Sequence, residues 1–150
     1  MIKKVETKEE ALECNRLLTM LIQDEKRYDS NINDSFEVSD WFEHLYFKND
    51  SALYIDIEDN KIVGYIYIKI KDLDITSIKT VEALIDGLYV LKEYRNRRIA
   101  TNLIEHAKEW CISKNINAIS LNVMYNNDIA RKLYNKFGFE NFSITLKCKI

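Results

Sequence analysis

One segment of the sequence combines a strand, a basic turn and the start of a helix. Residues 86–90 are short, apolar and β-favouring, which predicts a strand. Apolar residues at helical spacing then predict a helix over residues 96–114; they are Ile99, Ala100, Leu103, Ile104, Ala107 and Cys111. The turn between them carries Arg95, Arg97 and Arg98. Unpaired N–H groups at a helix start, beside arginines, favour the binding of a phosphate.

The same turn is equally compatible with an ordinary strand-to-helix connection whose arginines are solvated. A single motif of this kind is weak evidence for a ligand. The turn contains no glycine, which disfavours the glycine-rich phosphate loops of P-loop NTPases and Rossmann folds. A function for this turn therefore depends on a second motif elsewhere in the chain.

Composition indicates one soluble globular domain over residues 1–150. Hydrophobic residues make up 47% of the chain and charged residues 31%, and the net charge of −2 argues against a general nucleic-acid binder. The three cysteines have no metal-binding or redox spacing. The charged N-terminus does not look like a signal peptide, and no apolar run approaches the roughly 20 residues of a membrane span. We expect a cytoplasmic protein with no metal and no membrane partner.

The remaining patterns predict an α/β fold with a mixed central sheet flanked by helices. A capping box at Thr7 and Glu10 opens the first helix, and Ser39 is expected to cap a second that ends near Asn49. Strands are predicted over 2–5, 51–57, 62–70, 81–90, 118–124 and 139–149, with a polar connection at 71–80 and a last helix at 127–137. The strands over 51–57, 62–70 and 81–90 are expected to form an antiparallel meander. The strand over 118–124 is expected to lie parallel to 81–90, because a helix connects the two. Gly64 and Gly87 are positions for bulges or close backbone approach.

Two sequence motifs identify a resemblance. The first, after a strand ending in Val90, is Arg-Asn-Arg-Arg-Ile-Ala at residues 95–100. The second is Asn-x-x-Ala-x-x-x-Tyr-x-x-x-Gly-Phe at residues 127–139. Together with the order of elements they resemble the GNAT superfamily, the Gcn5-related N-acetyltransferases. The resemblance covers residues 62–139 well, whereas residues 1–60 match only in their helices.

The resemblance implies a GNAT-like fold and acetyl-CoA as co-substrate. In the first motif the family has Arg/Gln-x-x-Gly-x-Gly/Ala, so Arg98 takes the place of a glycine. We expect the Arg98 N–H to remain available, since early helix positions do not require a positive φ. By resemblance, the pyrophosphate meets the residues of the turn and helix start, which are Arg95, Asn96, Arg97, Arg98, Ile99, Ala100 and Thr101.

The resemblance also assigns the rest of the site. The backbone of Leu88, Tyr89 and Val90 would pair with the pantetheine arm where this strand splays from the next, and the Val90 N–H would face the oxyanion. Asn127 and Ala130 would meet the coenzyme. Tyr134 would protonate the departing thiolate; without the motif, it is better explained as a half-buried core aromatic.

The acceptor is expected to be an amine on a small molecule or a peptide. Asp86 could accept its proton or hold its charge, although a solvent-facing carboxylate is an equally good interpretation. An acidic ring of Asp24, Glu25, Asp29 and Asp34 around Tyr28 would favour a cation, with Asp86 deeper in the pocket, and a solvated acidic loop is equally compatible.

Two alternatives remain open at this point. The fold could serve a non-catalytic acyl-CoA-binding or regulatory domain, and an acceptor hydroxyl could replace the amine. A homodimer is also an expected state, because dimers are common on this fold, although no self-complementary surface is visible in the sequence.

Overall fold

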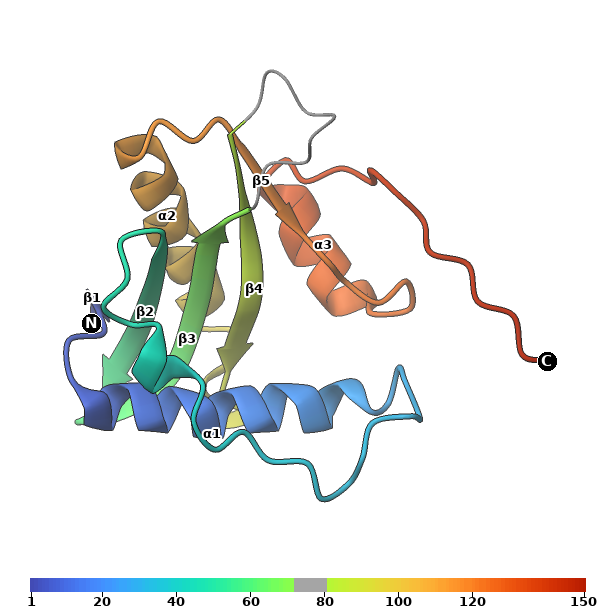
Figure 1. The fold of residues 1–150 in the computed structure, drawn as a ribbon, viewed down its shortest axis with the longest axis horizontal. Helices are drawn as coiled ribbons and strands as arrows, with labels where there is room; N and C mark the ends of the chain where they lie inside the picture. Colours follow the sequence, from blue (N-terminus) through green and yellow to red (C-terminus); the bar gives the residue numbers. More distant parts are fainter. Residues whose placement is uncertain (72–80) are drawn as a thin grey trace.

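The structure, a computed structural model, contains one five-stranded sheet of order β1-β2-β3-β4-β5 (Figure 1). It describes residues 1–71 and 81–150, so the predicted connection over 72–80 lies outside the described residues. The strands are β1 (Ile2–Lys4), β2 (Ser51–Glu58), β3 (Lys61–Ile70), β4 (Glu82–Val90) and β5 (Ala118–Leu121). β1 to β4 are antiparallel, while β4 and β5 are parallel. The predicted mixed sheet is confirmed.

Three helices flank this sheet: α1 (Lys8–Glu25), α2 (Ile99–Ser113) and α3 (Asp128–Lys136). α1 packs on β3 and β4, and α2 packs on β2 and β3. In Figure 1 α1 crosses in front of the sheet and α2 lies behind it. The core accordingly has two layers, with fully buried Leu17 from α1 in one and Leu103 from α2 in the other.

Both predicted glycine positions are irregular in the sheet. The β2–β3 register shifts beside Gly64, and the β3–β4 register shifts at Gly87 so that Asp86 becomes the extra residue. A Cβ on Gly64 would lie 3.0 Å from the Tyr89 carbonyl oxygen. A Cβ on Gly87 would lie only 2.8 Å from the Tyr65 hydroxyl. The Tyr65 side chain therefore fits under β4 because residue 87 is a glycine without a side chain.

The predicted second helix over residues 39–49 is wrong. Only a short 3₁₀ turn, η1 (Phe42–His44), forms there. Phe42 is its single buried anchor, with its ring 5.5 Å from Tyr65 and its N–H donating to the Asn15 side chain at 3.0 Å. Trp41 is 48% exposed, so the segment lacks the continuous apolar face that would hold a full helix on the sheet.

The C-terminal part departs from prediction in two ways. β5 ends at Leu121 instead of Met124, and no strand forms over residues 139–149. A strand needs a partner for its backbone, and this segment leaves α3 and runs clear of the body (Figure 1). On α3, Ile129 is 79% exposed, so this apolar side chain does not contribute to the core.

Candidate active site

The N-terminus of α2 carries no cap from its own side chains. Asn102 donates the first intrahelical bond to the Arg98 carbonyl at 2.9 Å, so the N–H groups of Ile99, Ala100 and Thr101 have no acceptor within the helix. The Arg98 side chain makes no capping hydrogen bond within the described residues. Three adjacent backbone donors at the positive end of a helix form an anion site.

The prediction that this turn needs no positive φ is wrong. Arg98 has φ +65° and Asn96 has φ +63°, both in the left-handed region. An L-residue with a Cβ is strained there by roughly 1–2 kcal/mol, whereas glycine is not. The glycine that the family motif has at this position would adopt this backbone without the strain, whereas this chain adopts it with an arginine.

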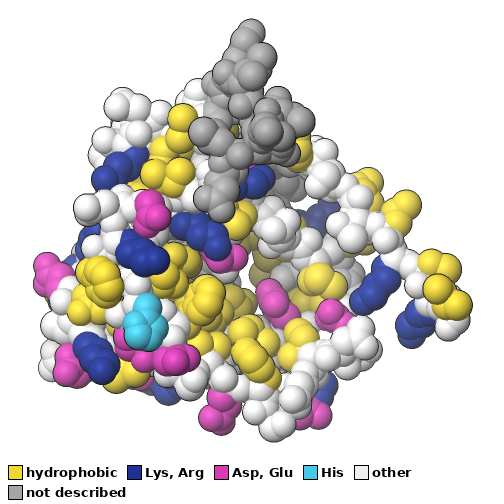
Figure 2. Space-filling model, viewed as in Figure 1, with side chains coloured by type: hydrophobic (Ala, Val, Ile, Leu, Met, Phe, Trp, Pro, Cys, Tyr) yellow, Lys and Arg dark blue, Asp and Glu magenta, His cyan; other side chains and the backbone are white. Residues whose placement is uncertain are grey.

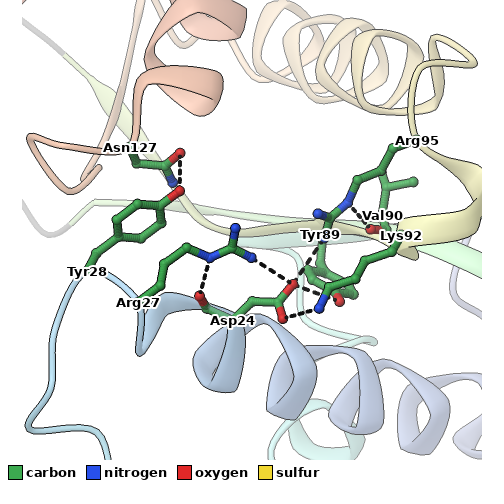
Figure 3. Close-up of polar contacts among 8 residues, drawn as sticks. All are labelled: Asp24, Arg27, Tyr28, Tyr89, Val90, Lys92, Arg95 and Asn127. Carbon is green, nitrogen blue, oxygen red and sulfur yellow. Dashed lines mark hydrogen bonds and ion pairs between the residues drawn. The ribbon is translucent and has the colours of Figure 1, made fainter.

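Arg95 of the turn is held by a carboxylate (Figure 3). Arg95 donates to the Val90 carbonyl at 3.0 Å and to Asp24 at 3.1 Å, and Lys92 lies 3.0 Å from the same carboxylate. Partial burial raises the pKa of Asp24, but the hydrogen bonds from Lys92 and Arg95 outweigh it and hold this pKa below its ordinary value. Asp24 thus fastens the turn to the end of α1.

Arg97 does not contact Asp24 but lies near Glu58, so the solvent-exposed side of the turn stays basic. Its guanidinium lies 3.5 Å from Glu58 and 5.0 Å from the Tyr94 ring centre, and 56% of its side chain is exposed. Arg98 is exposed as well. Arg95 is therefore a structural tie, whereas Arg97 and Arg98 remain accessible to an anion.

β4 and β5 separate where the sequence predicts a splay. Their pairing runs from Glu82 with Ala118 to Ile85 with Leu121, and the rest of β4 extends past this ladder. The carboxyl half of β4 therefore presents one edge toward the gap in front of α3.

The register identifies which backbone groups face that gap. The Leu91 N–H donates to the Val63 carbonyl, so Val63 and Leu91 form a hydrogen-bonded pair. The two kinds of pair alternate along an antiparallel ladder, so the neighbouring Gly64–Val90 pair is non-hydrogen-bonded. The N–H of Val90, and of Leu88 two residues earlier, points away from β3. The backbone N–H of Tyr89, one residue along, points toward β3 instead. The backbone of Tyr89 therefore does not lie on the free edge, where it was predicted.

The Tyr89 side chain has a different role. Its hydroxyl donates to Asp24 at 3.2 Å, on the same carboxylate that holds Lys92 and Arg95 (Figure 3). Tyr89 thus supports the basic turn from the strand that precedes it.

Asn127 joins the beginning of α3 to the segment after α1. Its side-chain oxygen accepts from the Ala130 N–H at 3.2 Å, which caps the helix. The Tyr28 hydroxyl donates to the same oxygen at 3.2 Å (Figure 3). This bond closes one side of the gap, and nothing in the sequence around Tyr28 predicts it.

Tyr134 lies half-buried on α3, with its ring 5.7 Å from that of Phe139. Burial, and then the nearby Glu25 carboxylate, raises the pKa of Tyr134 to about 12. Its phenol is therefore protonated throughout the physiological range.

Glu25, which was expected in the acidic ring around the acceptor, is a candidate site residue close to Tyr134. It ends α1, it is half-buried, and burial raises its pKa. The buried Tyr65 hydroxyl, which has no hydrogen-bond partner among the described residues, lies within electrostatic reach of Glu25, Asp86 and Tyr134. The position of Glu25 in the helix is also unusual, because a carboxylate at a helix C-terminus is unfavourable and the last turn of α1 holds no basic residue.

The other carboxylates are less free than the predicted acidic ring. Asp86 is exposed instead of deep in the pocket, and it pairs with Lys69 at 2.7 Å. Asp34 pairs with Lys26, and Asp24 belongs to the basic turn. Glu25 is the acidic side chain of this group whose charge acts on Tyr134.

Figure 2 shows the molecule hollowed between the sheet and α3, with apolar side chains on the floor and acidic side chains beside it. In residues 1–71 and 81–150, no three His, Cys, Asp or Glu side chains are grouped so as to hold a metal ion. Among the helices that the structure describes, none is long and apolar enough to cross a membrane.

The chain belongs to the Acetyltransferase (GNAT) family, whose model matches residues 15–139. This confirms the resemblance that the two motifs suggest.

Two curated relatives give more particular likenesses. A Bacillus subtilis (strain 168) protein, named for N-acetylation of an alanine of ribosomal protein bS18, is 34% identical over 104 residues, or 67% of this chain and 62% of the relative. Streptothricin acetyltransferase of Escherichia coli is 34% identical over 90 residues, or 60% of this chain and 48% of that enzyme. The chain thus spans about half to three-fifths of the length of these relatives.

Among solved structures, aminoglycoside N-acetyltransferase AAC(6')-Iy in complex with CoA superposes with a TM-score of 0.73. The match covers 100% of this chain and 98% of that one, at 19% sequence identity. A likeness at this identity shows that the fold is shared.

Proposed function

We propose that the chain is an acetyl-CoA-dependent N-acetyltransferase in which an amine attacks the thioester directly. The observation that carries the proposal is the uncapped N-terminus of α2 beside the splayed carboxyl half of β4. One offers donors for a pyrophosphate, and the other offers a strand edge for the amides of the pantetheine arm. The CoA complex of the structurally similar aminoglycoside acetyltransferase supports the same co-substrate.

The pyrophosphate would lie on the N–H groups of Ile99, Ala100 and Thr101. Arg97 and Arg98 would add charge from the solvent side, while Asn96 shapes the turn through its left-handed backbone. Arg95 would act by holding the turn to Asp24. The pantetheine arm would then pass Leu88 and Val90 on one side and Asn127 and Ala130 on the other.

In the reaction the amine nitrogen bonds to the acetyl carbonyl carbon, and the carbon–sulfur bond breaks. The Val90 N–H, which points away from β3, would stabilise the oxyanion. Tyr134 would donate a hydrogen bond to the departing thiolate. A free thiol has a pKa of roughly 8.5, below the value of about 12 for Tyr134. The phenol would therefore act mainly as a hydrogen-bond donor to sulfur as charge develops, and complete proton transfer would be uphill.

The amine must lose a proton, and two carboxylates are candidates. Asp86 is exposed and paired with Lys69, so its charge is already compensated. Glu25 is half-buried and lies within electrostatic reach of Tyr134, and its raised pKa makes it the better base. We therefore propose Glu25 as the proton acceptor, with Asp86 attracting the ammonium form at the entrance.

The acceptor proposed is a cationic amine, on a small molecule or a peptide. The relatives named for streptothricin and for a ribosomal protein alanine represent these two kinds of acceptor. A cytoplasmic location and a homodimer stay predictions.

Release of free thiol from acetyl-CoA tests the proposal. The panel should hold a polyamine, an aminoglycoside, a peptide with N-terminal alanine and, as the control, an amine that also carries carboxylates. Turnover is expected with at least one of the first three and least with the control. Binding of acetyl-CoA without turnover on any amine would favour the non-catalytic alternative.

A further inference from the structure

One tertiary hydrogen bond joins the segment after α1 to the start of α3. The Tyr28 hydroxyl donates to the Asn127 side-chain oxygen at 3.2 Å, and the two residues are 99 positions apart in the chain. Figure 3 shows the Tyr28 ring pointing from this segment toward α3, and Tyr28 is half-buried. The bond therefore fixes the spacing of two elements that lie on opposite sides of the hollow in front of β4.

The backbone couples Tyr28 to Glu25. The Glu25 carbonyl oxygen accepts from the Tyr28 N–H at 2.8 Å and from the Asp29 N–H at 3.1 Å. These bonds continue the last turn of α1 past the end of the helix. A displacement of Tyr28 would therefore move Glu25 with it.

α3 carries Tyr134 on the other side of the same contact. Asn127 is the N-cap of this helix, and Tyr134 follows seven residues later, which is roughly two helical turns. The two side chains thus lie on the same side of α3. The Glu25 carboxylate acts electrostatically on Tyr134. The end of α1 and α3 accordingly meet at two points, one at Tyr28 and one at Glu25.

We propose that Tyr28 is a positioning residue that holds the Glu25 carboxylate close to Tyr134 through its hydrogen bond to Asn127. This inference rests on the proposed function, in which Glu25 accepts the proton of the amine and Tyr134 donates to the departing sulfur. Tyr28 acts through Glu25 and not on the reacting atoms themselves.

The bond is compatible with a bound coenzyme. The Asn127 side-chain oxygen accepts from both Tyr28 and the Ala130 N–H, which uses the two lone pairs of an amide oxygen. The side-chain nitrogen of Asn127 carries two further donors, and no acceptor for them is found among the described residues. These donors can meet a carbonyl of the pantetheine arm while the oxygen stays bonded to Tyr28.

The titration of Glu25 reports whether the bond holds the carboxylate in place. Burial raises the pKa of Glu25. The titratable groups that reach it from other elements are the phenols of Tyr134 on α3 and Tyr65 on β3, whose own pKa values are raised, so both are uncharged at neutral pH. Asp24, its neighbour on α1, is paired with the basic turn. If the bond is lost and water reaches Glu25, its pKa should fall toward the ordinary value of a glutamate.

Tyr28→Phe in the full chain tests the proposal, because it removes the hydroxyl and keeps the ring. A carboxyl NMR titration of ¹³C-glutamate-labelled protein should give a lower pKa for Glu25 than in the wild type. With an accepted amine, kcat should fall roughly 10-fold, which is about what one lost hydrogen bond allows. The matched control is Tyr125→Phe, since this side chain is 81% exposed, and it should leave both quantities unchanged.

A double variant separates this bond from a general loosening of the site. Asn127→Ala removes the other partner and should also lower the pKa of Glu25. Because both substitutions break the same bond, adding Tyr28→Phe to Asn127→Ala should lower this pKa no further. Additive shifts would overturn the proposal, and so would a wild-type titration of Glu25 in Tyr28→Phe.

Failure of this inference differs from failure of the proposed function. If no amine is acetylated, the proposed function fails, while the titration, which needs no turnover, still decides whether Tyr28 holds Glu25. A lowered pKa of Glu25 beside a wild-type kcat in Tyr28→Phe would show that the reaction does not depend on this positioning, and it would overturn the inference.

Discussion

The N-termini of α1 and α2 differ in what is available to accept hydrogen bonds from their first backbone N–H groups. In α1 the Glu10 N–H donates to the Thr7 hydroxyl at 3.2 Å and the Thr7 N–H to the Glu10 carboxylate at 3.3 Å, and Glu9 adds a second negative charge. α2 has no acidic residue in its first turn, and its N-cap Arg98 is in the left-handed region. α1 is completed by its own side chains, whereas α2 is left with donors that suit an external anion.

This difference shows that the start of α2 is less stable than the start of α1. A side-chain cap contributes about 1 kcal/mol, and a left-handed arginine costs a similar amount. α2 therefore lacks one contribution and carries one cost at the turn proposed to hold the coenzyme. Such a local violation of helix rules is typical of a functional site.

The largest expected effect separates coenzyme binding at α2 from the chemistry at α3. Tyr134→Phe removes the hydroxyl without changing the ring that packs on Phe139. We expect kcat to fall by about 10²–10³ while acetyl-CoA affinity is unchanged, because the variant loses one hydrogen-bond donor to the charge that develops on the leaving sulfur. Steady-state kinetics and calorimetric titration measure the two quantities. Wild-type kcat in this variant would remove Tyr134 from the mechanism.

A second change gives α2 the acidic first turn of α1. Thr101→Asp places a carboxylate among the donors proposed for the pyrophosphate. Acetyl-CoA affinity should fall by roughly 100-fold through charge repulsion, while the free protein gains a few tenths of a kcal/mol from the helix dipole. Thr101→Asn is the control for size. Equal affinities for the two variants would contradict a phosphate at this position.

The two ends of α1 differ as well: its start is capped, whereas its last turn holds Glu25 and no basic residue. Glu25→Gln tests the C-terminal end. Burial raises the pKa of Glu25, so the folded state favours the protonated form. This contribution to stability is complete below the unfolded pKa and is lost as the pH rises through the folded pKa. Glu25→Gln should therefore raise the melting temperature at pH 7, with the gain vanishing near pH 4, and should lower kcat. A lower melting temperature at pH 7 would show that the carboxylate is stabilising.

The smallest effects compare the two helix starts directly. Thr7→Ala should cost about 1 kcal/mol of unfolding free energy, and Arg98→Gly should add up to about 1 kcal/mol by removing strain. For a chain of this length each change moves the melting temperature by roughly 2–4 °C. Acetyl-CoA affinity should be unaffected by Thr7→Ala. Destabilisation by Arg98→Gly would show that the Arg98 side chain matters more than its backbone strain.

Local patterns predicted much of this architecture. The capping box, the meander and the bulge at Gly87 depend on neighbouring residues, and all three are present. The family motif located α2 and Tyr134, but the role of Arg95 depends on Asp24, which lies 71 residues away. The positive φ of Arg98 is set by the turn and not by its side chain. The pattern over residues 139–149 predicts a strand, but none forms there, because a strand also needs a paired edge, which local pattern does not supply.

The central claim, that the start of α2 holds the pyrophosphate of the coenzyme, is tested most directly by amide chemical shifts in ¹⁵N-labelled protein titrated with CoA. The account predicts large saturable shifts at Ile99, Ala100 and Thr101, with Val90 following along the pantetheine path. The amides of Lys8 and Glu9 at the capped start of α1 are the internal reference and should not move. Saturable binding that leaves the α2 amides in place, or that shifts both helix starts equally, would contradict the account.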